Sequence, residues 1–414
     1  MDVHKYNLGD TVFYKKGDLY IGNINYKTLV NKEGSPLVCI LLDRIKKNIM
    51  TFKSILDIEY PNNKLYYALK ASYLRWIVEV VKNLGVGIET ISKLELDIAT
   101  RAGYKPQDII FNGIGRKSDD LYYAALEGII TNIDSLSELK KLISKKNPEE
   151  ELEIGLRIHP DFEKDDNFVK KDSKLGITYQ EANKCISLAL KNRLKISGLS
   201  FHIFSNKTDS TDYLLAIKNV LDYISKINSK FSVKIKYLDI GGGIAPRMFF
   251  ENDDKIKKFI RNITNMLKIN SPDITLIFEL GRYIVSDSVI ILSKISSLKR
   301  KGNKLWAILD IGTNYLIPTL GSQFKVIACQ KKTKSCLVSF ADGICSPAGF
   351  IDRTRISKIE EGNYVAVLNA GAYTSVMKEE FVFKSPKHVF IENNSIISIV
   401  DEMTTREVLK YHGW

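Results

Sequence analysis

The chain has 414 residues, more than one hydrophobic core usually supports, so we expect one large domain and a smaller one. Hydrophobic residues make up 44% of the sequence and charged residues 26%, which excludes a disordered or fibrous protein. The formal net charge of +13 could indicate nucleic-acid or membrane binding, but the basic residues are spread over predicted helix faces and loops. We therefore expect a solvated lysine-rich surface, a balance that would also suit an acidic substrate or an acidic carrier protein.

The start of the chain, Met1 to Lys5, lacks the apolar core of a signal peptide, and no later apolar run is long enough to cross a bilayer. We therefore expect a cytoplasmic protein without membrane or nucleic-acid partners. The five cysteines are scattered and lack the paired spacing of metal ligands, and the five histidines form no metal motif. This pattern predicts free thiols in a reducing compartment and no metal site.

Short strand-like pieces begin the chain, at Thr11 to Tyr14 and Leu19 to Ile24, before an apolar run and a helical pattern from Asp43 to about Glu59. Eight short apolar segments then alternate with amphipathic ones. The expected strands cover residues 65–69, 86–90, 109–112, 129–133, 153–158, 198–203, 235–240 and 275–280. The expected helices cover 74–84, 93–102, 119–127, 135–144, 179–190, 212–227 and 254–267. Alternation of this kind predicts a parallel sheet of the α/β class, and eight strands predict a closed (β/α)8 TIM barrel.

From about Val285 the pattern changes to β-branched runs that are separated by turn residues, with no helix of comparable length between them. This pattern predicts a mainly antiparallel β domain, and the N-terminal strands are its natural partners. We therefore predict three parts: N-terminal strands at residues 1–42 that join the β domain, a barrel at 43–284 and the β domain at 285–414.

The stretch Tyr66 to Ser72 carries a lysine, Lys70, at the end of an apolar strand. Burial lowers the pKa of an amine, and an uncharged amine can attack a carbonyl, so Lys70 suits Schiff-base formation. A lysine that simply leaves the strand for solvent would produce the same pattern. The stretch alone leaves both interpretations open.

Residues that could bind or react lie at the carboxyl end of nearly every predicted barrel strand, which is where active sites of barrels lie. They are Lys70, Glu89, Ser92, Asn112, Asp134, Arg157, His159, His202, Ser205, the glycines Gly241, Gly242 and Gly243, Glu279 and Arg282. Each of these residues alone could be structural. Their common position predicts a site at one mouth of the barrel.

Two features at the last strands suit a phosphate. The backbone of the glycine triplet at 241–243 could bind it, although such a triplet is often only a tight turn. The planar guanidinium of Arg282 also matches a phosphate. A phosphate-bearing aldehyde held by Lys70 would be pyridoxal 5′-phosphate. Glu279 could then face the pyridinium nitrogen or form an ordinary ion pair with Arg282, and His202 could stack on the ring or be a core residue.

These motifs resemble the fold-type III pyridoxal-phosphate decarboxylases, which include diaminopimelate, ornithine, lysine and arginine decarboxylases, over nearly the whole chain. The matching pieces are YYALKAS, GVGIETISKLELDIATRAG, GLRIHP, SKLGI, FHIFS, LDIGGG, ELGR, Cys345 followed by Asp352, and NAGAY with Tyr373. The resemblance implies a barrel of the alanine racemase type and a homodimer with shared active sites.

The resemblance also implies residue roles. Lys70 would be the Schiff-base lysine, with Glu89 in the same cofactor site, and His202 would stack on the pyridine ring. Ser205, Gly241, Gly242, Gly243, Arg282 and Tyr373 would bind the phosphate, and Glu279 would face the ring nitrogen. Cys345 would reach across the dimer interface to reprotonate the α-carbon.

Departures from the family pattern concern mainly the substrate. Leu280 replaces a proline, Phe204 a glycine, and Asp342-Gly343 the usual Gly-Pro. The stretch 309–318 lacks the arginine that diaminopimelate decarboxylases use for the far carboxylate, and Ser346-Pro347 follows Cys345 in place of a glutamate. The resemblance is therefore closer to the specialised branch that acts on modified amino acids in siderophore or antibiotic pathways. Arg247, Arg353 or Arg355 could contact the substrate from another direction.

Our leading hypothesis is a homodimeric decarboxylase of an amino acid or amino acid conjugate, in the biosynthesis of a specialised metabolite. Alternatives are a diaminopimelate, lysine or ornithine decarboxylase of primary metabolism, a racemase on the same barrel, and a decarboxylase-like binding protein without catalysis. Glu279 argues against the racemase, because racemases of this fold place an arginine beside the ring nitrogen. The presence of Lys70, Glu279, Arg282 and Cys345 argues against the binding protein.

Overall fold

The computed structural model describes residues 6–162, 170, 172–317, 321–345 and 349–414. The chain divides into two compact units. The first contains residues 1–48, 246–251 and 282–414, and the second contains residues 49–245 and 252–281. Residues 43–48, 246–251 and 282–284, which the sequence analysis assigns to the barrel, therefore lie in the first unit.

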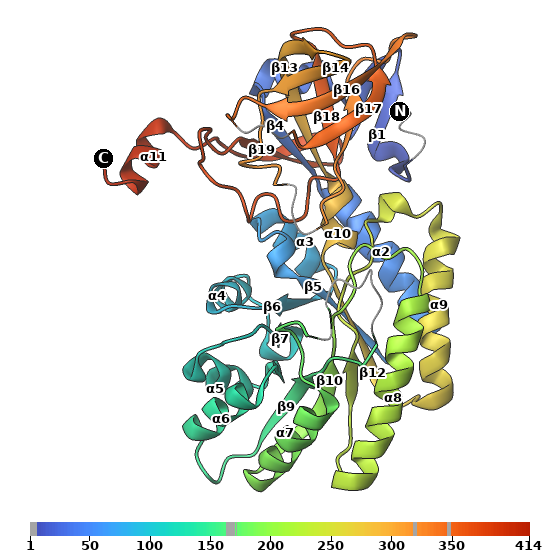
Figure 1. The fold of residues 1–414 in the computed structure, drawn as a ribbon, viewed down its shortest axis with the longest axis vertical. Helices are drawn as coiled ribbons and strands as arrows, with labels where there is room; N and C mark the ends of the chain where they lie inside the picture. Colours follow the sequence, from blue (N-terminus) through green and yellow to red (C-terminus); the bar gives the residue numbers. More distant parts are fainter. Residues whose placement is uncertain (1–5, 163–169, 171, 318–320, 346–348) are drawn as a thin grey trace. The chain divides into compact units, whose positions relative to one another are not determined.

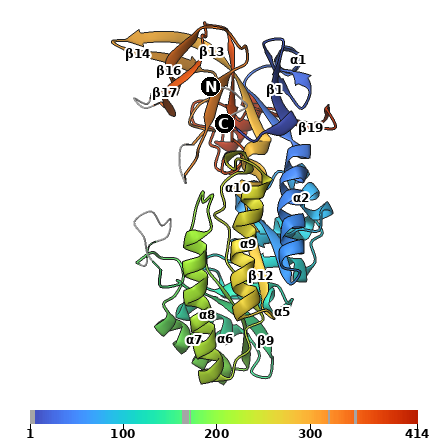
Figure 2. The same ribbon diagram turned by 90° about the vertical axis from the view of Figure 1, so that its right-hand side faces the viewer.

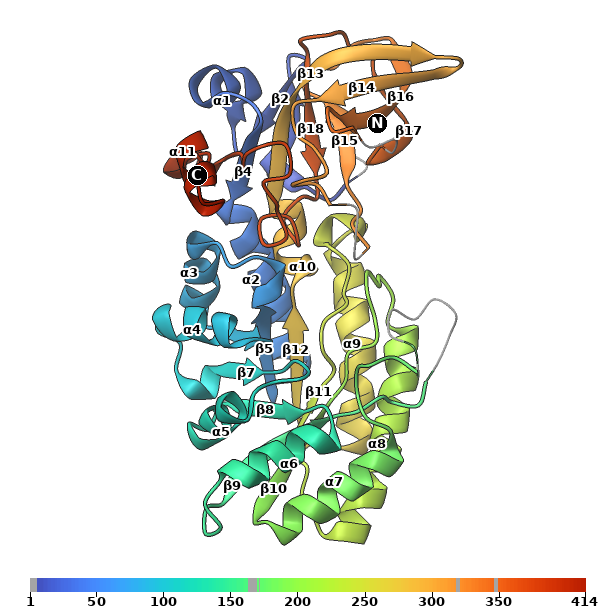
Figure 3. The ribbon, with the colours of Figure 1, turned by 60° about the vertical axis from the view of Figure 1, so that its left-hand side comes forward.

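The second unit is a closed barrel of parallel strands, as the alternating pattern predicts. Each strand pairs with the next along the chain, and β12 closes the barrel on β5 through the register Phe278 to Leu65 (Figure 3). The eight strands are β5 Asn63–Ala68, β6 Gly87–Thr90, β7 Ile109–Phe111, β8 Ile130–Ile133, β9 Leu152–Arg157, β10 Leu194–Ser200, β11 Tyr237–Asp239 and β12 Thr275–Leu280.

Helices surround the barrel strands, and α8 and α9 lie side by side (Figure 1, Figure 2). They are α3 Arg75–Asn83, α4 Lys93–Arg101, α5 Ser118–Leu126, α6 Leu136–Lys145, α7 Tyr179–Lys191, α8 Thr211–Phe231 and α9 Asp253–Asn270. Four of them begin at a side chain that accepts a backbone N–H of the first turn: Ser92, Ser135, Thr178 and Asn252. These caps satisfy donors that the helix leaves unpaired, which sets where each helix begins.

The barrel interior holds two tyrosines, Tyr66 and Tyr237, packed with Ile110 and Ile277. Glycines in the barrel strands leave room for these rings. A Cβ at Gly87 would lie 2.5 Å from the Tyr66 ring, and one at Gly198 would lie 2.1 Å from the Tyr237 ring. The interior is therefore filled by side chains, as is usual for a barrel of eight strands.

The first unit contains a nine-stranded mixed sheet within the described residues. Its strands are β4 Leu37–Leu41, β13 Val289–Lys301, β14 Lys304–Leu309, β15 Lys325–Ala328, β16 Ser335–Asp342, β17 Ile351–Ser357, β18 Tyr364–Leu368, β19 Lys387–Glu392 and β20 Ser395–Val400. Most neighbouring pairs are antiparallel, and β14 with β16 and β4 with β19 are parallel. The sheet therefore agrees with the predicted β domain, and β17 is a strand that the sequence analysis does not predict.

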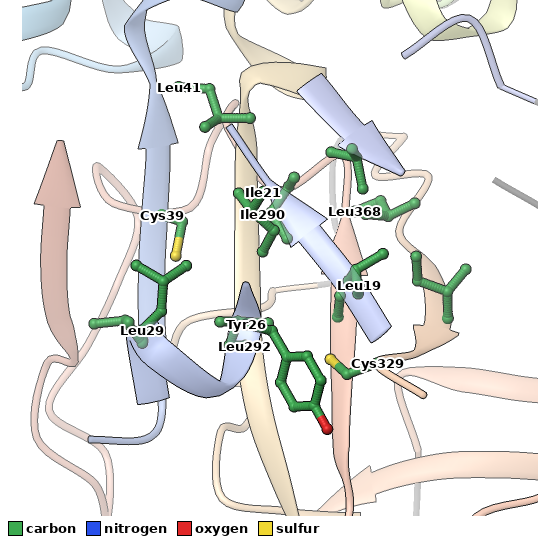
Figure 4. Close-up of a cluster of buried hydrophobic side chains, with 14 of the residues drawn as sticks. Leu19, Ile21, Tyr26, Leu29, Cys39, Leu41, Ile290, Leu292, Cys329 and Leu368 are labelled. Carbon is green, nitrogen blue, oxygen red and sulfur yellow. The ribbon is translucent and has the colours of Figure 1, made fainter. Parts of the chain in front are cut away.

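The N-terminal strands are arranged in two ways. β4 lies between β13 and β19, so this strand joins the β domain as predicted. β1 Val12–Lys15, β2 Asp18–Ile21 and β3 Ile24–Asn25 pair with each other in a separate three-stranded sheet. Figure 4 shows Leu19, Tyr26 and Ile290 in the apolar cluster that joins these elements.

Helix α1, Tyr26–Glu33, is absent from the sequence prediction. Its ends carry recognisable signals, because the Asn25 side chain accepts the N–H of Lys27 and Gly34 ends the helix at φ +86°. Helix α2, Leu42–Glu59, contains the boundary between the units, and α10 Arg282–Val285 and α11 Thr405–Tyr411 are short. In the part of the chain described, no helix is long and apolar enough to span a membrane.

Candidate active site

Lys70 lies in the single turn Leu69–Ala71 that follows β5, and its ammonium donates to Oε2 of Glu89 at the end of β6. The two strands are neighbours, with Ala68 opposite Glu89. The Glu89 side chain is only 1% exposed and that of Lys70 is 29% exposed. Lys70 is therefore held at the barrel mouth by a buried carboxylate, and does not simply extend into solvent.

The glycine triplet after β11 forms a turn that only glycine fits. Gly241 and Gly243 have φ angles of +68° and +94°, which L side chains rarely adopt. A Cβ at Gly242 would lie 2.1 Å from the carbonyl oxygen of Glu279, and one at Gly243 would lie 2.4 Å from that of Phe204. The turn therefore presents bare backbone, the arrangement that a phosphate-binding turn requires.

His202 is fixed by this turn, because its Nδ1 accepts the N–H of Gly242 at 3.1 Å. An accepting Nδ1 leaves the proton of the neutral ring on Nε2. The carbonyl of Gly242 in turn accepts the hydroxyl of Tyr213 at 2.6 Å. Ser205 is half-buried in the same loop as His202. The loop after β10 and the turn after β11 therefore hold each other in place.

Glu279 lies in β12 and is 6% exposed. Its Oε1 accepts the side-chain amide of Asn112 at 2.5 Å. Burial raises the pKa of Glu279 well above its usual value, and the negative charges of Asp239 and Glu89 raise it further, while Lys70 opposes them. Glu279 therefore favours its protonated form more than an exposed glutamate does, and it lies beside a second buried carboxyl group, Asp239.

Arg282 and Tyr373 form a pair within the first unit. The guanidinium carbon of Arg282 lies 4.7 Å from the centre of the Tyr373 ring, which is a cation–π contact. Burial lowers the pKa of Arg282, and Tyr373 opposes that shift. Tyr373 itself has a φ angle of +61°, an uncommon conformation for a residue with a side chain.

Cys345 follows β16 and its thiol is exposed. The loop before it is tied down by Asp342, whose Oδ1 accepts the N–H of Ile344 at 3.0 Å. The other oxygen of Asp342 accepts the N–H of Thr313 at 2.6 Å, so one carboxylate joins the two loops that the family pattern associates with the substrate. In the sequence, Asp342 stands out only because Asp342-Gly343 replaces the usual Gly-Pro. Ser346 and Pro347 lie outside the described residues.

The other candidates have varied environments. Ser92 is the N-cap of α4, which gives it a structural role. Asp134 lies 3.4 Å from Arg157, and burial raises the pKa of Asp134 to about 6 against the effect of this arginine. His159 and Arg247 are buried, whereas Arg353 and Arg355 are on β17. Among the described residues, no three His, Cys, Asp or Glu side chains are grouped to bind a metal.

Four buried residues near the barrel mouth or in the barrel strands were not candidates from sequence. Asp239, Asn132 and Tyr237 belong to barrel strands, and Glu95 belongs to helix α4. Asp239 belongs to the LDIGGG motif, and its Oδ1 accepts the N–H of Gly241 at 2.9 Å. Asn132 and Tyr237 lie within apolar strands, where side chains that point into a barrel cannot be recognised without the strand register.

The barrel unit offers the chemical groups that pyridoxal phosphate needs. They are an amine on Lys70, a turn at 241–243 that a Cβ would obstruct, an oriented imidazole on His202 and a buried carboxyl group on Glu279. Family comparison agrees with this fit. The pyridoxal-binding domain of the pyridoxal-dependent decarboxylases matches residues 42–286, and their C-terminal sheet domain matches residues 282–371. The chain belongs to this family.

Individual relatives cover nearly the whole length of this pyridoxal-dependent decarboxylase. A diaminopimelate decarboxylase of Aquifex aeolicus is 30% identical, over 92% of this chain and 93% of the relative. One from Methanothermobacter thermautotrophicus is 27% identical, over 95% of each chain. The crystal structure of AQ1208 from Aquifex aeolicus matches with a TM-score of 0.83 at 26% identity, over 98% of each chain.

A diaminopimelate decarboxylase from M. jannaschii, in complex with L-lysine, matches with a TM-score of 0.88 over 98% of each chain. At 24% identity this match supports the fold alone. The family membership makes the protein a pyridoxal-phosphate-dependent amino acid decarboxylase. The comparisons give no support to a closer relation with the specialised siderophore and antibiotic branch, because the relatives named above are diaminopimelate decarboxylases.

Proposed function

We propose that this enzyme decarboxylates a diamino acid of the diaminopimelate class in primary metabolism. The observation that carries the proposal is the 30% identity to the Aquifex aeolicus diaminopimelate decarboxylase over 92% of the chain. The positions of Lys70, Glu89 and His202 at the ends of barrel strands support it. This substrate replaces the specialised conjugate of our leading hypothesis. Lysine and ornithine decarboxylation are the alternatives within the same class of basic substrates.

The proposed cofactor contacts begin with Lys70, which would hold pyridoxal phosphate covalently, with Glu89 as its neighbour. Once bound, the cofactor withdraws electrons and so stabilises the negative charge left on the α-carbon when carbon dioxide departs. His202 would support one face of the ring through its bond to Gly242. Glu279, as a carboxylate, would face the ring nitrogen and keep it protonated.

The phosphate ligands stay predictions from the family pattern. The bare backbone of Gly241, Gly242 and Gly243 supports a role in phosphate binding, because a close approach of the phosphate requires residues without a Cβ. Ser205 would add a hydroxyl group. Arg282 would add a planar cation, and its stacking on the Tyr373 ring supports a fixed orientation of the guanidinium.

Cys345 is the proposed acid that delivers a proton to the α-carbon. Its exposure in the isolated chain supports a role at an interface between two copies, as the family pattern implies. The protein would then be a homodimer with shared active sites. Mixing Lys70→Ala subunits with Cys345→Ala subunits tests this arrangement, because a mixed dimer regains one intact site, up to about a quarter of the wild-type activity. Failure of any mixture to regain activity would contradict shared sites.

Carbon dioxide release tests the substrate. Purified protein with pyridoxal phosphate is assayed with meso-diaminopimelate, lysine, ornithine, arginine and a citryl conjugate of a diamine-forming amino acid. The proposal predicts the highest kcat/KM for diaminopimelate and no release by the Lys70→Ala variant. A higher kcat/KM for the conjugate would favour the hypothesis of a decarboxylase in the biosynthesis of a specialised metabolite. Exchange and inversion at the α-carbon in heavy water, without carbon dioxide release, would indicate a racemase.

Substrate binding has one unusual requirement here. Residues 309–317 contain no arginine, so the far carboxylate of diaminopimelate needs another cation. The candidates from sequence are Arg247, Arg353 and Arg355. Each single arginine-to-methionine variant is measured with diaminopimelate and with lysine. A rise in KM for diaminopimelate alone identifies the carboxylate ligand.

A further inference from the structure

A chain of hydrogen bonds crosses the barrel interior and ends on Glu279. The hydroxyl of Tyr237 donates to Oδ1 of Asn132 at 2.7 Å, and Nδ2 of Asn132 donates to Oδ1 of Asn112 at 2.9 Å. Nδ2 of Asn112 then donates to Oε1 of Glu279 at 2.5 Å. The four side chains are buried and come from β11, β8, the end of β7 and β12.

The direction of this chain is set by Tyr237. Burial raises the pKa of the Tyr237 hydroxyl well above its usual value, and the charge of Asp239 adds to the shift, so the hydroxyl keeps its proton and donates it. The oxygen of Asn132 must then face Tyr237, and its amino group must face Asn112. Asn112 is oriented in the same way, so it presents an amino group to Glu279. An amide turned the other way would present its oxygen and favour a protonated carboxyl group.

The barrel wall is shaped to hold this chain. Gly155 of β9 and Gly198 of β10 are directly opposite each other in the strand register. A Cβ at Gly155 would lie 2.0 Å from Oδ1 of Asn132 and 2.1 Å from the hydroxyl of Tyr237. A Cβ at Gly198 would lie 2.1 Å from the Tyr237 ring. This pair of glycines therefore makes the space in which the tyrosine and the asparagine meet.

Burial and nearby negative charges favour the protonated form of Glu279, against the effect of the Asn112 amide. Asp239 is a neighbouring buried carboxyl group, and its negative charge raises the pKa of Glu279. Oδ2 of Asp239 has no donor within the described part of the chain. The titratable groups around the pair belong to several elements: Glu89 on β6, Lys70 after β5, Tyr66 on β5, Arg157 on β9 and His202 after β10.

We propose that the Tyr237–Asn132–Asn112 chain is a positioning network that keeps an acceptor oxygen of Glu279 aimed into the barrel and favours its carboxylate form. The inference rests on the proposed role of Glu279 toward the ring nitrogen of the cofactor. Burial and Asp239 favour a proton on Glu279, and the oriented amide of Asn112 favours its loss. A cationic ring nitrogen then needs to supply only the remaining free energy that converts Glu279 to its carboxylate form. Tyr237 acts through the two asparagines and touches no reacting atom.

The decisive variant is Tyr237→Phe, which removes one hydroxyl and keeps the ring between the two glycines. In cofactor-free protein, infrared spectroscopy follows the carboxyl band of Glu279 with pH, assigned by its loss in Glu279→Gln. Loss of one hydrogen bond predicts that the midpoint of this titration rises by about one pH unit, because the amides are free to turn. An unchanged midpoint would overturn the proposal.

A second readout uses protein loaded with pyridoxal phosphate that is labelled with 15N in the ring. The 15N chemical shift is expected to indicate a protonated nitrogen in the wild type and a partly unprotonated one in Tyr237→Phe. A wild type that binds no cofactor would defeat the proposed function and leave the infrared test intact. A protonated nitrogen in both proteins would overturn the network and leave the proposed function standing.

Tyr60→Phe is the matched control. The hydroxyl of Tyr60 is also buried and donates to the carbonyl of Ile274 at 2.7 Å, away from this chain. Both variants lose one buried hydroxyl bond, so a similar fall in thermal stability is expected, but only Tyr237→Phe shifts the titration. If Tyr237→Phe fails to fold, Asn132→Leu breaks the middle link and must give the same shift. Equal titration shifts in Tyr60→Phe would show a general effect and contradict the proposal.

Discussion

Glu89 holds Lys70 at the barrel mouth through an ion pair in which the carboxylate is 1% exposed and the lysine side chain 29% exposed. Lys70 follows β5 and Glu89 lies in the neighbouring strand β6, so the pair connects the ends of two adjacent strands. Its burial is one-sided. The carboxylate depends on the lysine for compensation of its charge, while the lysine keeps contact with solvent, where a carbonyl compound can reach it.

Because Glu89 is buried and Lys70 is partly exposed, the effects of changing the two residues on the free energy of unfolding should not be additive. Lys70→Ala leaves the Glu89 carboxylate buried without its cation, so the free energy of unfolding is expected to fall by about 1–3 kcal/mol. Glu89→Gln in the same chain removes the stranded charge, and the double variant should recover part of the loss. Urea unfolding of the four cofactor-free proteins measures the cycle. Strictly additive effects would show that the two side chains do not interact.

Glu95 predicts a pH dependence of stability. Burial and the neighbouring charge of Glu89 raise the pKa of Glu95 to about 7, against the N–H of Ile91 and the charge of Lys70. Between the unfolded pKa of a glutamate and this value, the folded state holds more protons than the unfolded state. The free energy of unfolding contributed by Glu95 therefore falls as pH rises through this window and is constant above it.

Glu95→Gln removes this titration and keeps an oxygen for the N–H of Ile91. The variant is expected to gain stability relative to the wild type between pH 5 and pH 7.5, by the order of 2 kcal/mol. Thermal unfolding at several pH values measures the difference. Glu153→Gln, an exposed glutamate paired with Lys236, is the control and should give a flat difference. A flat difference for Glu95→Gln as well would contradict the buried titration.

Replacement of Asp342, which lies outside the barrel, is expected to lower the activity. Its carboxylate accepts the N–H groups of Thr313 and Ile344, so Asp342→Ala frees both loops. The two lost bonds are expected to lower kcat by at least about tenfold, because Cys345 immediately follows the Asp342–Ile344 turn. Asp352→Ala, an exposed carboxylate paired with Lys304, is the control. Equal kcat values for the two variants would exclude this role of Asp342.

The close contact between Gly198 and the Tyr237 ring predicts that Gly198→Ala destabilises the protein and that a smaller side chain at Tyr237 partly restores its stability. The added methyl group of Gly198→Ala would meet the Tyr237 ring, and such overpacking is expected to cost about 1–3 kcal/mol of the free energy of unfolding. Combining it with Tyr237→Leu removes the ring from that position. The double variant should be less destabilised than the sum of the two single variants, as measured by thermal unfolding. If the loss of stability in the double variant equals the sum of the two single losses, the Tyr237 ring moves away from the added methyl group without strain.

The fold was predictable largely because short apolar strands alternate with amphipathic helices. The same argument fails for α1, since Tyr26–Glu33 is short and lies among strand-like pieces, although Asn25 and Gly34 mark its ends. It also fails for β17, because most residues of Ile351–Ser357 are polar and only Ile356 is buried. Helix α1 does have a buried face, formed by Tyr26, Leu29 and Val30, but eight residues are too few for a helical period to stand out from the strand-like pieces around it.

The position of a candidate residue at a strand end could be predicted where it depends on that residue's own strand, as for Lys70, Glu89, His202 and Glu279, whose proposed roles stay predictions. It was not predictable where function depends on register between strands far apart in sequence. Asn132 and Tyr237 look like ordinary strand residues, and only closure of the barrel brings them together. The tie from Asp342 to Thr313 likewise joins two loops 29 residues apart, which no local motif encodes.

The most direct test of the account is chemical trapping of the cofactor. The purified protein is incubated with pyridoxal phosphate, reduced with borohydride and digested, and the peptides are identified by mass spectrometry. The account predicts one modified peptide with the added mass on Lys70, and no modified peptide from the Lys70→Ala variant. Modification of a different lysine, or none at all in protein that is folded, would contradict the assignment of the barrel mouth as the cofactor site.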